Sequence, residues 1–333
     1  MNKFLNLIPV FIIIVLVTAC TKQNEPKALD VDIQLKRSND YFANLRAYKA
    51  SPHQIYFGWF GGTGGPGNPS FAGIYDAIPD SVDIVSLWGG YPPLGSHNHQ
   101  LLQKNRSLKG IKFVWCMFGS GVESLMKKND NTLFLNDKML AIEKVAKAMA
   151  DTIALYQLDG FDLDYEPSEA SERNAIFGTS FDSPDGSNQY VFKLFQELGK
   201  YMGPKSGTEN LLIIDGYSEK GVEPYYNYFM QQAYNSSSGA NLSSRLLTYG
   251  LGECPPEKFV PCENFEDHWR SGGVNFSDPV RGTVPSLFGF AYWQPSGGRK
   301  GGIGSYHTEY EYALTPDYYY TRRAIQIMNP AAK

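Results

Sequence analysis

The 333-residue chain is poor in cysteine and histidine and has no excess of basic residues. It contains four Cys and five His, and no Cys spacing of the kind that ligates a metal, so no metal or other cofactor is expected. With 30 Lys and Arg against 34 Asp and Glu, the formal net charge of −4 gives no reason to expect nucleic acid as a partner. No Gly-Lys-Ser/Thr follows the glycine-rich stretch 61–67, which is therefore not a phosphate cradle. Internal repeats and an obvious interdomain linker are also missing.

What the chain does have is the composition of a globular enzyme. Hydrophobic residues make up 42% and charged residues 19%, and the length allows one large domain or two small ones. Aromatic residues reach 14%, with 22 Tyr and 20 Phe. Such a content serves packing in most proteins, and it also suits faces that bind sugar rings.

The N-terminus has the pattern of an export signal. Lys3 precedes a largely apolar run over residues 4–18, and Val17-Thr18-Ala19-Cys20 resembles a bacterial lipobox, in which the Cys is lipidated after cleavage. A plain cleaved signal peptide or a membrane anchor is the alternative, although the run is short for a membrane span. We expect a signal peptide over 1–19, a lipidated Cys20 with a tether over 20–45, and a protein held in the cell envelope at the outer membrane. The side of that membrane is left undetermined.

The other three cysteines fall in two settings. Cys116 lies in an apolar run and is expected to be a buried free thiol. Cys254 and Cys262 flank a short Pro-containing loop, and an exported protein meets an oxidising compartment. A Cys254–Cys262 disulfide and two free thiols are both compatible with this spacing.

Short apolar runs alternate with helix-like stretches along residues 46–333. Eight runs are candidate strands: Gln54–Gly61, Val82–Trp88, Ile111–Phe118, Gly160–Glu166, Leu211–Tyr217, Phe229–Tyr234, Arg245–Gly250 and Leu287–Trp293. Helical spacing is seen in Met139–Leu155, Gln189–Met202 and Tyr318–Met328. Alternating strands and helices in this number predict an α/β fold, a single (β/α)8 TIM barrel, with a doubly wound open sheet as the alternative.

The fourth candidate strand carries a row of acids. Because alternate residues of a strand share a face, Asp162, Asp164 and Glu166 point one way, and the apolar residues between them point the other way. In a barrel the acids would face the interior, which is costly for ionised carboxylates unless they are hydrogen-bonded or protonated. A Ca²⁺ or Mg²⁺ site is a rival interpretation, but no second acidic cluster at another strand end completes a ligand shell. Glu309 and Glu311 are expected at the surface.

The pattern Asp159-Gly160-x-Asp162-x-Asp164-x-Glu166 resembles the signature of family 18 glycoside hydrolases, the chitinases and endo-β-N-acetylglucosaminidases. Gln232-Ala233-Tyr234-Asn235 resembles the Gln-x-Tyr-Asn of that family, and Trp293, on the expected eighth strand, resembles its subsite tryptophan. The third strand departs from the family pattern at residues 117–121. The resemblance covers residues 48–328.

The resemblance implies a retaining, substrate-assisted hydrolysis, in which the substrate's 2-acetamido oxygen is the nucleophile. Glu166 would be the general acid and base, Asp164 would hold the acetamido N–H, Asp162 would share a proton with Asp164, and Tyr234 would orient the acetamido carbonyl. The expected sugar-binding residues are Trp293, Gln232, Asp159, Trp59 and Trp88. Among these, Asp159 stands near the strand start, where a structural role is favoured.

Three features favour an endoglycosidase acting on N-glycan cores. The stretch between the last two expected strands, 250–287, is too short for the α+β insertion of many chitinases. The glycine-rich stretch 61–67 and the lipoprotein signal resemble bacterial endo-β-N-acetylglucosaminidases of the F and H type. A chitinase acting on chitin oligomers and an inactive glycan-binding barrel remain the alternatives.

Overall fold

The computed structural model describes residues 37–61 and 74–330. The signal segment, Cys20, the greater part of the tether and most of the glycine-rich stretch lie outside these residues. By contacts the chain divides into residues 1–39 and 40–333, and every strand of the barrel belongs to the second unit. Within the described residues, no helix combines the length and the apolar character needed to cross a membrane.

Eight parallel strands close into a barrel in the order β1-β10-β7-β6-β5-β4-β3-β2. The strands are β1 (Ile55–Phe60), β2 (Ile84–Leu87), β3 (Lys112–Phe118), β4 (Gly160–Tyr165), β5 (Leu211–Gly216), β6 (Tyr228–Gln232), β7 (Phe259–Asn264) and β10 (Gly302–Tyr306). The pairing of Ile55 with Gly302 closes the ring. The prediction of a TIM barrel is thereby confirmed, and the open sheet is excluded.

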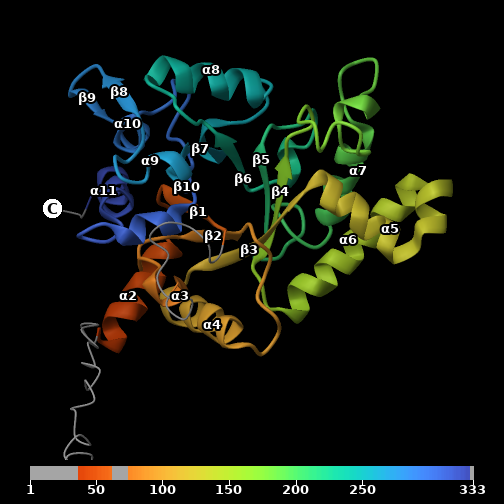
Figure 1. Ribbon diagram of the computed structural model, residues 1–333, viewed down its shortest axis with the longest axis horizontal. Coiled ribbons are helices and arrows are strands. Elements are labelled where there is room, and N and C mark those ends of the chain that lie inside the picture. The colour runs from red at the N-terminus through yellow and green to blue at the C-terminus, as the bar shows by residue number, and fades with distance from the viewer. Residues whose placement is uncertain (1–36, 62–73, 331–333) are drawn as a thin grey trace, which may run out of the picture. The chain divides into compact units, whose positions relative to one another are not determined.

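Helices surround the strands (Figure 1). They are α2 (Asn39–Lys49), α3 (Ile74–Ala77), α4 (His97–Lys109), α5 (Gly119–Asn136), α6 (Lys138–Leu155), α7 (Gln189–Leu198), α8 (Gly239–Tyr249), α9 (Phe265–His268), α10 (Ser286–Tyr292) and α11 (Tyr319–Met328). A two-stranded antiparallel hairpin, β8 (Asn275–Asp278) and β9 (Gly282–Pro285), lies between β7 and β10. No α+β domain is inserted among the described residues of that connection.

Because side chains alternate between the two faces of each strand, the barrel has two apolar cores, one inside it and one between the strands and the helices. The residues of β1 divide cleanly: Phe57 and Trp59 join a small apolar cluster inside the barrel, whereas Tyr56 and Phe60 join the large layer between barrel and helices. This is the period-2 pattern that a parallel barrel with both faces covered requires.

The seventh and eighth strands were predicted wrongly. Residues 245–249 belong to helix α8 and Gly250 is its C-cap; Leu242, Leu246 and Tyr249 follow helical spacing after the N-cap Ser238. Residues 287–293 form α10 and its end, because a short, fully buried apolar run fits a helix as well as a strand.

The true last strands carry weak strand signals. β7 contains Pro261, and β10 reads Gly-Ile-Gly-Ser-Tyr, both of which lower strand propensity. The glycines of β10 are required by its neighbour, since a Cβ on Gly302 would lie 2.1 Å from the carbonyl oxygen of Ile55. This close approach of two backbones cannot be read from the sequence.

Candidate active site

The acidic row lies where the alternation places it. Asp162 and Asp164 point into the barrel and are buried, while Phe161, Leu163 and Tyr165 join the layer beneath the helices. Glu166 follows the last residue of β4 and is only partly buried. The carboxyl-terminal end of a barrel strand is the position at which TIM-barrel enzymes carry their reacting groups.

Asp162 is held by neutral donors. The Trp59 indole Nε1 donates to its Oδ2 at 3.2 Å, and the Ser86 hydroxyl donates to the same oxygen at 2.6 Å. Burial raises the pKa of Asp162 to about 6 in spite of these hydrogen bonds. The Asp162 carboxyl therefore keeps its proton to a higher pH than an exposed Asp does.

Asp164 has two carboxyl neighbours. Its partner in the ladder on β5 is Asp215, and Glu166 is two residues further along its own strand. Burial raises the pKa of Asp164 well above its usual range, and the charges of Glu166 and Asp162 raise it further. Such a group shares its proton with its neighbours and titrates as part of a set.

Gln232 and Asp215 complete the acid cluster. The Gln232 side-chain amide donates to Glu166 Oε1 at 2.6 Å and to Asp215 Oδ1 at 3.0 Å. The sequence analysis named Gln232 but missed Asp215, because a single acid in the run Leu-Leu-Ile-Ile-Asp-Gly has no patterned companion. Its only signal was a charged residue inside a strand that was otherwise expected to be apolar.

Tyr234 lies just after β6, beside the acids. Its pKa is raised by burial and by the charges of Asp215 and other nearby acids, so the phenol stays protonated and can donate a hydrogen bond. Arg245 donates to its backbone carbonyl at 3.3 Å, and Glu263 accepts from the next amide, that of Asn235, at 3.0 Å. Asn235 has a φ of +59°, so the chain turns sharply there and the turn fixes the tyrosine.

An aromatic wall rises beside the acid cluster. Tyr306, at the end of β10, lies with its ring centroid 5.5 Å from that of Trp88, 6.4 Å from that of Trp59 and 6.2 Å from that of Tyr234. Trp88 is 37% exposed, whereas Trp59 is 2% exposed and contacts Asp162 instead of solvent. We name Tyr306 and Trp88 the aromatic wall; they are the ring faces that a sugar could reach.

Trp293 does not occupy the place that the sequence analysis gave it. It follows helix α10, its ring lies 6.1 Å from Phe259, and a Cβ on Gly239 would touch it. Phe259 belongs to the layer outside the barrel, so Trp293 packs there, between β7 and α8. The error follows from the wrong eighth strand, and the aromatic at the end of the true eighth strand is Tyr306.

Asp159 stands at the opposite end of β4 from Glu166. Both of its oxygens accept from Arg106 Nε at 2.9 Å, and Oδ2 also accepts from the Phe113 amide at 2.9 Å. The side chain thus joins helix α4 to the starts of β3 and β4. Next to it, Gly160 has a φ of +144°, and a Cβ there would meet the backbone of β5 at 2.0 Å. The Asp-Gly half of the signature is therefore structural.

Replacing Asp159 with Asn should lower stability without changing the chemistry. Asn keeps the size but loses the charge paired with half-exposed Arg106, so we expect the free energy of unfolding to fall by about 1–3 kcal/mol. Urea titration measures the loss, and kcat for the reaction at the acid row should stay within about twofold of the unchanged protein. A large fall in kcat in folded protein would contradict the structural role of Asp159.

The structure distinguishes between the two alternatives left open for Cys254 and Cys262. Cys116, Cys254 and Cys262 are free thiols. Cys262 faces the barrel interior and Cys254 the outer layer, so the two side chains lie on opposite sides of the barrel wall. The buried thiol predicted for Cys116 is confirmed.

One group of side chains has a metal-like geometry. The ligand atoms of Cys116, Asp162 and Asp215 lie within 4.8 Å of one another. Burial raises the pKa of the Cys116 thiol well above its usual range, and the nearby acids raise it further, which opposes the thiolate that a metal needs. We therefore treat the three as part of the acid cluster.

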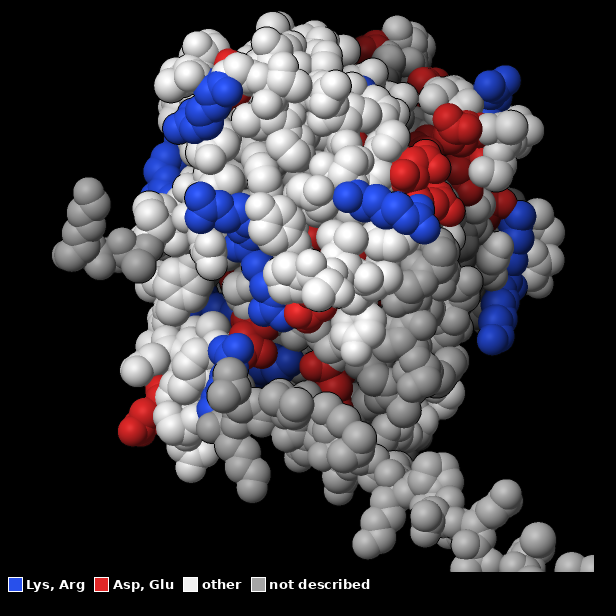
Figure 2. All heavy atoms as spheres, turned by 60° about the vertical axis from the view of Figure 1, so that its left-hand side comes forward, with Lys and Arg blue, Asp and Glu red and all other residues white. Residues whose placement is uncertain are grey.

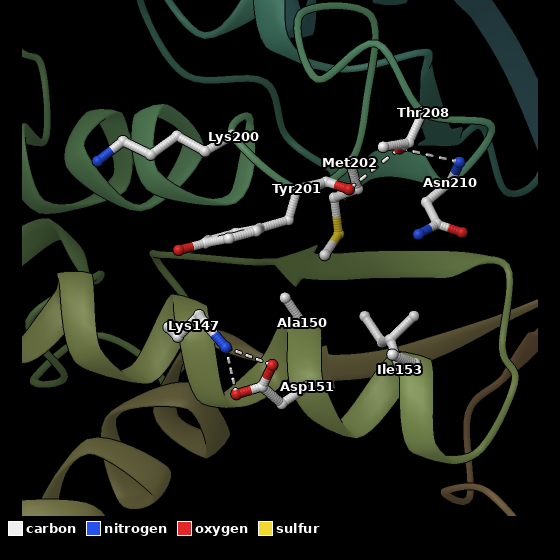
Figure 3. A pocket seen from close by; sticks show the side chains of 10 residues that line it. Lys147, Ala150, Asp151, Ile153, Lys200, Tyr201, Met202, Thr208 and Asn210 are labelled. Atoms are coloured by element: carbon white, nitrogen blue, oxygen red, sulfur yellow. Dashed lines mark hydrogen bonds and ion pairs between the residues drawn. The ribbon is translucent and has the colours of Figure 1, made fainter.

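Two further surface features lie outside the acid cluster. A hollow between α6 and the segment before β5 contains the Lys147–Asp151 ion pair (Figure 3). It lies at the amino-terminal side of β5, away from the acid cluster. The face shown in Figure 2 carries Lys and Arg among Asp and Glu on a largely uncharged surface.

Glu309 and Glu311 are fully buried, contrary to expectation. Glu309 accepts from the Gly61 amide at 3.0 Å and contacts His307 Nδ1 at 2.7 Å, which ties the end of β1 to the residue after Tyr306. Glu311 accepts from the first backbone amides of α11, where a carboxylate is favourable to the helix dipole.

Comparison with known proteins decides the family. The sequence profile of glycoside hydrolase family 18, BT1044-like, matches residues 26–327. The chain belongs to glycoside hydrolase family 18. It is 28% identical to endo-beta-N-acetylglucosaminidase F2 of Elizabethkingia meningoseptica over 96% of both chains.

Solved structures of similar proteins agree in fold. The structure of BT1044 superposes with a TM-score of 0.72 at 26% identity, over 88% of this chain and 93% of the other. An endo-beta-N-acetylglucosaminidase from Cordyceps militaris superposes with a TM-score of 0.61 at 26% identity, over 88% of this chain and 97% of the other. The acid cluster is therefore the candidate active site of a glycoside hydrolase.

Proposed function

We propose that the protein is an endo-β-N-acetylglucosaminidase that cuts the GlcNAc-β1,4-GlcNAc bond of N-glycan cores with retention of configuration. Two relatives support this substrate class, the F2 enzyme and the Cordyceps militaris enzyme, both named endo-beta-N-acetylglucosaminidases. The barrel's lack of an α+β insertion among its described residues is consistent with the proposal. Without such an insertion, the face of the barrel at the carboxyl-terminal ends of the strands is less enclosed, which suits a branched glycan.

The observation that carries the proposal is the placement of Asp164 and Glu166 on one face of one strand. Retaining hydrolases with a protein nucleophile place two carboxyls about 5–5.5 Å apart on either side of the scissile bond. Asp164 and Glu166 instead project from the same side of β4, and their carboxyls are close enough to hydrogen-bond to each other, so they do not face each other across a substrate bond. This arrangement supports a mechanism in which the substrate supplies the nucleophile.

The proposed reaction gives a role to each of the acids on β4 and to Tyr234. Glu166, partly buried at the strand end, donates a proton to the glycosidic oxygen, and the acetamido oxygen of the sugar attacks C1 to give an oxazolinium. Asp164 as a carboxylate accepts the acetamido N–H and stabilises the positive charge that develops there. The Tyr234 hydroxyl donates to the acetamido carbonyl oxygen, and Asp162 shares a proton with Asp164. Glu166 finally takes a proton from the water that opens the ring.

The aromatic wall supplies binding rather than chemistry. Replacing Tyr306 with Ala should raise KM for a glycan about tenfold and change kcat less, because the lost ring contact stabilises bound substrate and transition state alike. Tyr306→Phe keeps the ring and should behave nearly as the unchanged enzyme. Tyr312→Ala is the control, since Tyr312 is an exposed tyrosine that lies on the 3₁₀ helix beyond β10. Steady-state kinetics on one labelled glycopeptide compare the variants; an equal KM for Tyr306→Ala and Tyr312→Ala would contradict the sugar contact.

One experiment tests the function. The protein is incubated with a high-mannose glycoprotein, a complex-type glycoprotein and chitin oligomers, and the products are read by mass spectrometry. We expect a glycan ending in one GlcNAc to be released and one GlcNAc to stay on the protein. Cleavage of chitin oligomers alone would make the protein a chitinase, and binding of a glycan without cleavage would make it a binding protein. The lipid anchor at Cys20 stays a prediction.

A further inference from the structure

Asp215 is the one acid of the cluster that the mechanism above leaves without a step. It is fully buried on the interior face of β5, opposite Asp164 in the ladder, where paired residues of neighbouring strands lie about 5 Å apart. One of its oxygens lies within 4.8 Å of an oxygen of Asp162. Asp215 thus touches both acids that are expected to share a proton.

The acid cluster contains more carboxyl groups than can be ionised at the same time. Among the described residues, the side chains other than carboxyls that hydrogen-bond to these acids are all neutral: Trp59, Ser86, Cys116 and Gln232. Buried carboxylates without a cation nearby repel one another, so part of the set keeps its protons. The pKa of Asp215 is raised by burial and then by the charges of Asp164 and Asp162.

The free oxygens show where those protons lie. Asp162 Oδ1, Asp164 Oδ1 and Asp215 Oδ2 are buried and have no partner outside the cluster. A buried carboxyl oxygen without a partner is costly, and a proton between two such oxygens satisfies both. Asp164 and Asp215 are close enough to hydrogen-bond to each other through one proton.

Gln232 extends the connection to the general acid. Its two amide hydrogens are spent on Asp215 and Glu166, so one planar group sets the distance between these two carboxyls. A change at Asp215 therefore alters the position of Glu166 through Gln232, and it alters the protonation of Asp164 directly.

We propose that Asp215 is a positioning residue that takes the proton of Asp164 when a 2-acetamido sugar binds and that orients Glu166 through Gln232. An O–H bond on Asp164 breaks and an O–H bond on Asp215 forms, so the charge of the cluster does not change. The Asp164 carboxylate left behind accepts the acetamido N–H of the sugar. The identity of the sugar rests on the proposed function, whereas the shared proton does not.

The test is Asp215→Asn, which keeps the size and cannot take up the proton. We expect kcat on a glycopeptide to fall about 10–100-fold with KM within about threefold. The acidic limb of the kcat/KM profile should move to lower pH, because removing the acid removes the repulsion that raises the pKa of Asp164. Carboxyl carbon NMR on the free protein should show Asp164 titrating at lower pH in the variant, and circular dichroism should show an unchanged fold.

The matched control is Glu172→Gln, another buried carboxyl made neutral. Glu172 accepts from the backbone and side chain of Ser120, outside the acid cluster, so its variant should leave both titration curves unchanged. A kcat for Asp215→Asn reduced equally at every pH, or an unchanged Asp164 titration, would overturn the proposal. If the unchanged protein cleaves no glycan, the proposed function fails, and the NMR titration alone still decides the role of Asp215.

Discussion

Glu166→Gln should abolish glycan hydrolysis, lowering kcat by roughly 10²–10⁴-fold, the range of general acid–base catalysis. Gln can still accept and donate hydrogen bonds, including one with Gln232, so the site should keep its shape. The amide cannot transfer a proton to the glycosidic oxygen or take one from water. Release of glycan from a labelled glycopeptide measures the loss.

The control for this variant is three residues away. Glu169 is exposed, and Glu169→Gln removes the same charge from the same loop without touching the acid cluster. Its kcat should equal that of the unchanged protein. Binding of the glycopeptide to Glu166→Gln, followed by calorimetry, should remain within a few fold. If Glu166→Gln turns over at near-normal rate, the proton donor is another residue.

The second large effect concerns the substrate. A glycan whose reacting sugar carries a hydroxyl in place of the 2-acetamido group should not be cleaved at a measurable rate. The substitution removes the nucleophile and the N–H that Asp164 is expected to accept, and a hydroxyl at that carbon cannot form an oxazolinium. Rates on the paired substrates, measured by mass spectrometry, give the ratio.

A complementary measurement uses a stable mimic of the intermediate. A thiazoline analogue of GlcNAc resembles the oxazolinium and should inhibit competitively. Equal rates on the two substrates, together with no inhibition, would point to a protein nucleophile and contradict the assisted route.

The part of the site that lies on one strand could be predicted from the sequence. Asp162, Asp164 and Glu166 alternate with apolar residues, so their common face follows from strand geometry alone. The barrel also followed from the recurrence of strands and helices. Six of the eight strands were placed correctly because their runs are rich in β-branched and aromatic residues.

The parts of the site that depend on which strands pair, and in which register, could not be predicted from the sequence. Asp215 joins the cluster only because β5 pairs with β4 in a register that places it opposite Asp164. Tyr306 joins the site only because Gly302 and Gly304 allow β10 to pack closely on its neighbours. A glycine-rich run gives no strand signal by itself, so the more hydrophobic residues 287–293 were preferred, and Trp293 was taken into the site with them.

Strand β4 also separates two tasks along its length. The carboxyl of Asp159 and that of Glu166 are seven residues apart, about 23 Å along an extended strand. Side chains so far apart and without shared partners contribute almost independently to the free energies in which they take part. Substitutions around Arg106 can therefore change thermal stability while substitutions at the opposite rim change which glycans bind. Substrate preference in this barrel can thus diverge without loss of folding stability.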